Sequence, residues 1–121
     1  MTARAGASKR YDRGSGAIAA LAVVAASVAL TALVIPLAVV LTARAGLEGA
    51  ADAAALAAAD ATTGVVPGEP CEVAARVARA DGGSLERCEV DGLVVTVRVE
   101  ASVGALGVRA DATAGPAGAA G

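Results

Sequence analysis

Hydrophobic residues are concentrated in one uninterrupted stretch near the start of the chain. Residues 14–43 contain no charged side chain, and Arg13 and Arg44 flank them. A bilayer core about 30 Å thick requires roughly 20 apolar residues of helix. The sequence therefore predicts a transmembrane helix over residues 14–43, in which Pro36 produces a tolerated kink.

A cleaved secretory signal is the alternative interpretation of this stretch. The basic start, the apolar run and the triplet Ala43-Arg44-Ala45 are typical of such signals. The apolar cores of signals are only about 7–15 residues long, however, and this run is longer. We therefore favour a retained single-pass anchor.

The pattern changes after Arg44 from purely apolar to alanine-rich. Residues 44–62 combine alanine with isolated charges and are strong helix formers, so they predict a helical extension of the anchor. Small residues at every third or fourth position let another helix approach closely, which favours lateral assembly, although helix propensity alone also explains them. Asp52 is a candidate contact to a partner subunit, and its simpler interpretation is a solvent-exposed stripe with Glu48.

The remaining sequence predicts a small α+β domain. Residues 63–70 form a linker, Pro70 opens a short helix that Gly82-Gly83 closes, and the helix turns an apolar face inward. We expect this domain to cover residues 71–113 and to pack its helix on a three-stranded antiparallel meander. Residues 114–121 are expected to form a disordered tail, which could begin at Thr113.

Two turns define the meander. Asp91-Gly92 predicts a type I′ turn, which sets Val90 opposite Leu93 and Cys88 opposite Val95 on the inner face. A face with Val94, Thr96 and Leu85 then remains available to bind a protein.

The second turn, at Gly104-Ala105, comes with an independent check of its register. It places Glu100 opposite Arg109 and Arg98 opposite Asp111, so that opposite charges face each other across the strands. A register shifted by one residue would lose both pairs and bury the wrong face. We therefore expect Val103 to face Leu106.

The two cysteines, Cys71 and Cys88, both lie on inner faces, one on the short helix and one on the first strand. A disulfide closing this loop contributes about 3 kcal/mol, which matters in a domain with so thin a core. A redox pair or a metal site is a poorer explanation, because 17 positions separate the cysteines and the chain contains no histidine. The sequence predicts a structural disulfide.

Charge predicts the orientation of the chain in the membrane. Residues 1–13 have a net charge of +3, with four basic residues and one acidic, and the rest has −5, with six basic and eleven acidic. The basic end is expected in the cytoplasm and the acidic domain on the outer side, where disulfides persist. The basic cluster is better explained by topology than by nucleic-acid binding, because no aromatic residues accompany it.

Three stretches together resemble the TadE-like pilus-assembly proteins. They are the leader Lys9-Arg10-Tyr11-Asp12-Arg13-Gly14-Ser15-Gly16, the segment Ala50-Ala51-Asp52-Ala53-Ala54-Ala55-Leu56-Ala57-Ala58-Ala59, and Pro70-Cys71 with Cys88-x-Val90-x-Gly92. The resemblance covers residues 9–100 and is strongest to the short, disulfide-bearing branch found in tight-adherence (Flp) pilus and type II secretion-like clusters of high-GC Gram-positive bacteria.

The resemblance implies a minor pilin or pseudopilin that acts as a structural or assembly component. Its partners would be membrane lipid, other pilin-like or TadE-like subunits, assembly proteins and a prepilin peptidase. Relatives are cut after a glycine that follows basic residues, which here is Gly14, leaving Ser15 as the new N-terminus. Residues 17–19 (Ala-Ile-Ala) stand where many relatives carry a glutamate.

Other function classes fit the residues less well. A membrane-tethered binding module for an envelope protein is the alternative, and gene neighbours would distinguish the two. An enzyme is not expected, because no nucleophile has an evident base in the sequence. Because histidine, the commonest ligand in metal sites, is absent, we predict no metal site. We also predict no cofactor and no nucleic acid as a partner.

Overall fold

A computed structural model describes the backbone of residues 2–118 and the side chains of residues 14–118. The chain divides into two compact units, Met1–Ala38 and Val39–Gly121. We call the first unit the anchor and the second the head, and we describe each by itself. The fold is α+β, as the sequence predicts.

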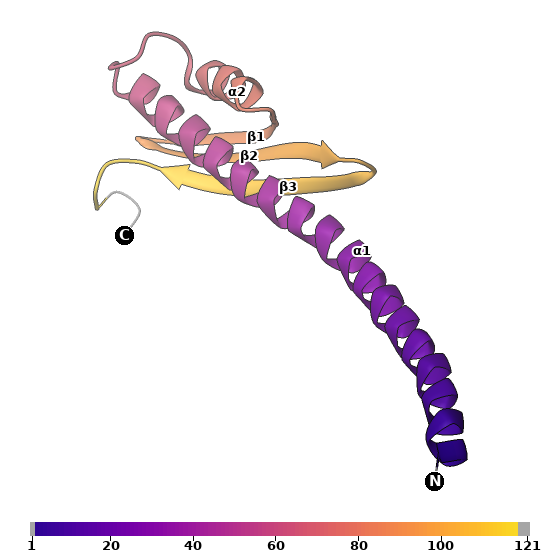
Figure 1. Ribbon diagram of the computed structural model, residues 1–121. Coiled ribbons are helices and arrows are strands. Elements are labelled where there is room, and N and C mark those ends of the chain that lie inside the picture. The colour runs from indigo at the N-terminus through magenta and orange to yellow at the C-terminus, as the bar shows by residue number, and fades with distance from the viewer. Residues whose placement is uncertain (1, 119–121) are drawn as a thin grey trace. The chain divides into compact units, whose positions relative to one another are not determined.

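Five elements make up the described part of the chain (Figure 1): α1 (Thr2–Thr62), α2 (Pro70–Ala80), β1 (Ser84–Asp91), β2 (Val94–Val103) and β3 (Leu106–Ala114). The anchor contains the first part of α1, and the head contains the rest of α1 and all the other elements. The three strands form an antiparallel meander in the order β1-β2-β3.

Both helices end in the same way within the head. At the end of α1, Gly64 has a φ of 82°, and the amides of Gly64 and Val65 donate to the carbonyls of Ala61 and Asp60. This pattern is a Schellman motif, in which glycine takes up the left-handed conformation that stops a helix. Gly82 and Gly83 terminate α2 by the same pattern of bonds. The predicted helix end at Gly82-Gly83 is therefore confirmed.

One side of the sheet carries the core of the head. The largest fully buried side chains are Val95, Val97 and Val99 of β2. Small residues surround them, namely Ala50, Ala51, Ala54, Ala55 and Ala58 of α1, Ala74 and Ala78 of α2, and Ala110, Ala112 and Ala114 of β3. Because alanine side chains are short, they let a helix axis approach a sheet closely, and the core is thin.

The buried alanines of α1 lie at helical spacing on one face, which also includes Leu47. In the described head these small residues contact the chain's own sheet. The expectation that they serve lateral assembly is therefore wrong for this face, because it is already covered.

The register of β2 and β3 is as predicted. Val103 pairs with Leu106, Glu100 with Arg109 and Arg98 with Asp111. Gly104, with a φ of 61°, occupies the first central position of the turn, where a type II′ hairpin requires a positive φ. Strand β3 continues to Ala114, which is buried, so Thr113 belongs to the sheet and not to the tail.

The predicted register of the first hairpin is wrong. Asp91 pairs with Val94, Val90 with Val95 and Cys88 with Val97, and the turn consists of Gly92 and Leu93. A type I′ turn on Asp91-Gly92 would need a positive φ at Asp91, whereas the observed turn needs one only at Gly92, whose φ is 61°. Glycine again takes the first central position.

An irregularity in β1 corrects a second expectation. The register shifts between Leu85 and Arg87, so Glu86 is an extra residue opposite β2. This bulge turns Leu85 toward the core, against which it packs, while Thr96 points to the opposite face. Leu85 and Thr96 therefore do not share the binding face that the sequence predicted.

Candidate functional site

The described side chains of the anchor, those of residues 14–38, form an exposed and mainly apolar surface. The part of α1 from Gly14 to Thr62 is long and apolar enough to span a membrane, and an 18-residue window within it has a mean hydropathy of 2.7. The large apolar side chains of this segment are exposed, for example Ile18 at 71%, Leu21 at 70% and Leu33 at 73%. Exposed apolar side chains on a helix of this length are suited to contact with lipid or with other apolar helices.

The polar side chains in the middle of this segment are satisfied within the helix. Ser27 donates to the Val23 carbonyl and Thr31 to the Ser27 carbonyl, each at 2.8 Å. Both residues can therefore face lipid without an unpaired hydroxyl. Pro36 lies inside α1, which continues through it.

The candidate processing site, Gly14 and Ser15, also lies in α1 and is exposed. A Cβ atom added to Gly14 would meet no atom within 4 Å, so packing does not explain this glycine. A helical peptide bond must open locally before a protease can cut it, so cleavage here would require fraying of α1.

The predicted disulfide between Cys71 and Cys88 is present and joins α2 to β1, with the two Cα atoms 5.8 Å apart. Cys88 packs against the core, and β1 has no contact to β3 in the sheet order. The disulfide thus ties α2 to the strand farthest from β3.

A row of ion pairs crosses the outer face of the sheet, the face away from the core. Arg98 donates to both carboxylate oxygens of Asp111, from Nε to Oδ1 at 2.6 Å and from Nη2 to Oδ2 at 3.1 Å. Arg109 lies 3.1 Å from Glu86 and 3.9 Å from Glu100. The bulge at Glu86 brings that third partner into the row, and no sequence pattern predicts it.

The interaction between Arg98 and Asp111 shifts the pKa values of both side chains. The hydrogen bonds from Arg98 lower the pKa of Asp111 below its usual value, the charges of Arg98 and Arg87 act in the same direction, and partial desolvation opposes them. The same hydrogen bond raises the pKa of Arg98. Both residues remain charged over the physiological pH range.

Asp52 is exposed on α1 and, among the residues that the structure describes, has no ion-pair partner. Glu48, which the sequence grouped with it, pairs instead with Arg44 at 3.3 Å. Asp52 lies in a hollow of about 400 Å³ that is lined by Asp52, Leu56, Thr113, Ala114 and Gly115. Sequence reasoning missed this hollow because it joins α1 to the end of β3, which are far apart along the chain.

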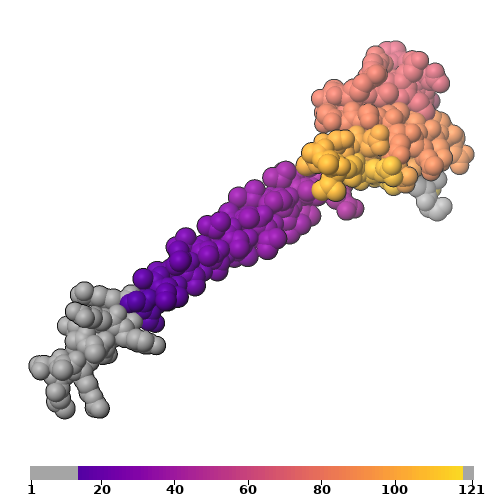
Figure 2. Space-filling view, turned by 90° about the vertical axis from the view of Figure 1, so that its right-hand side faces the viewer, coloured from indigo at the N-terminus to yellow at the C-terminus, as the bar shows by residue number. Residues whose placement is uncertain are grey.

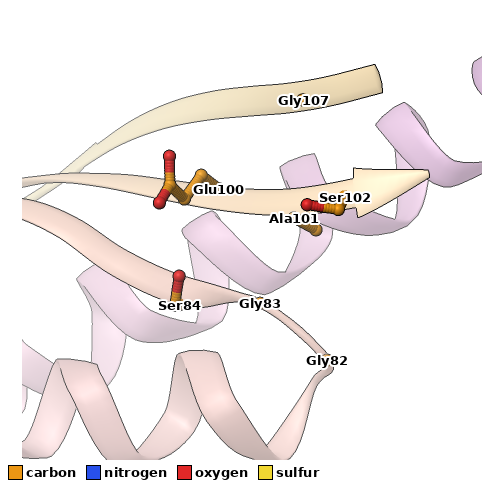
Figure 3. A pocket seen from close by; sticks show the side chains of 7 residues that line it. All are labelled: Gly82, Gly83, Ser84, Glu100, Ala101, Ser102 and Gly107. Atoms are coloured by element: carbon orange, nitrogen blue, oxygen red, sulfur yellow. The ribbon is translucent and has the colours of Figure 1, made fainter. Parts of the chain in front are cut away.

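A second hollow, of about 330 Å³, lies where β1 begins and β2 ends (Figure 3). Ser84 is directly opposite Glu100 there, and Ala101, Ser102 and three glycines complete the lining. Its polar groups are two hydroxyls and one carboxylate, which can offer hydrogen bonds to a polar ligand. In the described part of the chain, no three His, Cys, Asp or Glu side chains are grouped to hold a metal ion.

Comparison with known proteins identifies no relative of this chain. No protein family matches it, and no curated protein or solved structure is detectably similar to it.

Proposed function

We propose that this chain is a membrane-anchored, TadE-like minor pilin or pseudopilin, a non-enzymatic structural or assembly component of a tight-adherence pilus or a secretion-like machine. The observation that carries the proposal is the exposed apolar segment of α1, which is suited to contact with lipid or with other helices. The small oxidised head adds to it, because a disulfide suits a domain outside the cytoplasm. The resemblance of three sequence stretches supplies the family.

In this proposal the anchor crosses the cell membrane once, with the basic leader in the cytoplasm and the head outside. Helix packing in the membrane holds the protein to neighbouring subunits, and the head presents its charged outer face as a contact surface. Asp52 is available for a partner because it is exposed and unpaired. A prepilin peptidase would cut between Gly14 and Ser15.

Affinity purification after reversible cross-linking in native membranes tests the assembly role. We expect small single-helix membrane proteins and a secretion ATPase complex to be recovered with the chain. Recovery of a single envelope protein without these components would favour the alternative, a membrane-tethered binding module. An Asp52→Ala variant should lose part of this set, whereas Glu72→Ala, at an exposed position on α2, should not.

Two further measurements test orientation and processing separately. Protease added outside intact spheroplasts should digest the head, and digestion only after lysis would contradict the proposed topology. Mass spectrometry of the extracted protein should find an N-terminus at Ser15. An intact start at Met1 or Thr2 would remove the cleavage step but not the membrane role.

A further inference from the structure

Strand β3 is an edge strand with an unusually open side. Among residues 2–118, the order β1-β2-β3 leaves β3 paired only with β2, and β3 has nine residues without proline or bulge. Figure 2 shows β3, in yellow, at the surface of the head. Edge strands usually carry features that prevent pairing with another chain. The other edge strand, β1, has such a feature in its bulge at Glu86.

The hairpin geometry determines which backbone groups of β3 are free. Val103 and Leu106 flank a two-residue turn, so they form a hydrogen-bonded pair, and the pairs alternate from there along the ladder. Alternate residues of β3 therefore point their N–H and C=O groups away from β2. These residues are Gly107, Arg109, Asp111 and Thr113.

The free edge of β3 is complementary to the same edge of a second copy of the chain. When a second copy of β3 runs antiparallel about a two-fold axis at Ala110, Arg109 lies opposite Asp111 of the second copy, and Gly107 lies opposite Thr113. Opposite charges placed across strands are stabilising. A register two residues away in either direction sets Arg109 against Arg109 or Asp111 against Asp111, so charge selects a single register.

The two charged side chains can each take a further partner. Arg109 is 62% exposed and Asp111 is 58% exposed, although each already has partners in its own chain. A guanidinium has five N–H donors and a carboxylate accepts about four hydrogen bonds, so capacity remains on both.

An exposed leucine and a hollow support the same register. Leu106 is 58% exposed and has its side chain on the core-facing side of β3, like Ala110 and Ala114. In the two-fold pairing, Leu106 of the second copy lies beside Ala114. Ala114 lines the 400 Å³ hollow together with Leu56, which is 59% exposed. The pairing would thus cover Leu56 and Leu106 in each copy.

We propose that β3 is a self-association surface, through which two copies of this chain join their sheets into one antiparallel six-stranded sheet. The contact is isologous, so each copy contributes the same residues. Its axis is perpendicular to the sheet, so the α1 segments of the two heads run in opposite directions. The contact is therefore distinct from side-by-side packing of parallel helices, and it does not rest on the pilus role.

A charge-complementation experiment tests the pairing on the full chain in detergent. Arg109→Asp places aspartate opposite aspartate in a homodimer, and Asp111→Arg places arginine opposite arginine. Each variant alone should dimerise roughly tenfold or more weakly than the wild type, because two attractive pairs become repulsive. An equimolar mixture should form a heterodimer, since all its cross-strand pairs are again opposite in charge. Analytical ultracentrifugation measures all three samples.

Two further variants test whether β3 is the surface through which the copies associate. Arg76→Asp makes the same charge change at an exposed position of α2, which does not contact β3, and should leave dimerisation unaltered. Leu106→Ala removes an exposed side chain, so the head should keep its fold while the dimer weakens. A wild type that stays monomeric up to about 1 mM, single variants that associate as the wild type does, or a mixture that fails to associate would each overturn the proposal.

Discussion

Arg98 and Asp111 face each other on the outer side of β2 and β3 and are joined by two hydrogen bonds, at 2.6 and 3.1 Å. The paired geometry matches the planar fork of a guanidinium to a carboxylate. On the same face of the sheet, Arg109 lies between Glu86 and Glu100 and contacts both. Every strand of the sheet therefore contributes at least one charged side chain to these ion pairs.

Acid should weaken the head through Asp111. Its pKa is lower in the folded chain than in the unfolded one, so its contribution to stability is complete above the usual aspartate pKa of about 3.9. It is lost as the pH falls through the lower native pKa. Urea unfolding from pH 6 to pH 2 should show a smaller acid-dependent loss for Asp111→Asn than for the wild type. Equal pH profiles would contradict a role for the pair.

The cysteine pair should contribute a large share of the stability of the head. The disulfide closes a loop with a sequence separation of 17, for which chain entropy gives about 3 kcal/mol. The Cys71→Ala/Cys88→Ala double variant should unfold at a much lower urea concentration than the oxidised wild type. Wild type treated with reductant should behave like the variant. If oxidised and reduced wild type unfold together, the bond does not stabilise the fold.

Gly83 should not tolerate a side chain. A Cβ atom there would contact Val99 and lie 3.0 Å from Cδ1 of Leu47, both in the core. Gly83→Ala should destabilise the head by about 1–3 kcal/mol, since well-packed cores resist extra atoms. Gly49→Ala is the matched control, because its Cβ would meet nothing within 4 Å and alanine is the better helix former. The midpoint temperature of thermal unfolding should rise for Gly49→Ala and fall for Gly83→Ala.

The sequence predicted those parts of the fold in which several local signals agree. The second hairpin has a glycine at its turn and opposite charges across its strands, and its register was predicted correctly. The first hairpin has two overlapping signals, Asp91-Gly92 and Gly92-Leu93, and no pair of opposite charges across its strands to decide between them. The simpler turn, with one positive φ, is the one that forms.

The candidate surfaces were harder to predict because they depend on tertiary contacts. The alanines of α1 have the same spacing whether they face a second protein or the chain's own sheet, and periodicity cannot distinguish these partners. The bulge at Glu86, which reorients Leu85, leaves no mark in the hydrophobic pattern. The hollow beside Asp52 likewise joins residues that are distant in sequence.

The closeness of α1 to the sheet gives the last prediction. Ala54 is fully buried in the core cluster with Val95, Val97 and Val99. Ala54→Leu should destabilise the head by about 1–3 kcal/mol, because the longer side chain would push the helix away from the sheet. Ala45→Leu, at an exposed position of the same helix, should have almost no effect. Urea unfolding of the two variants measures the difference, and equal midpoints would show that the alanine face does not set the packing distance.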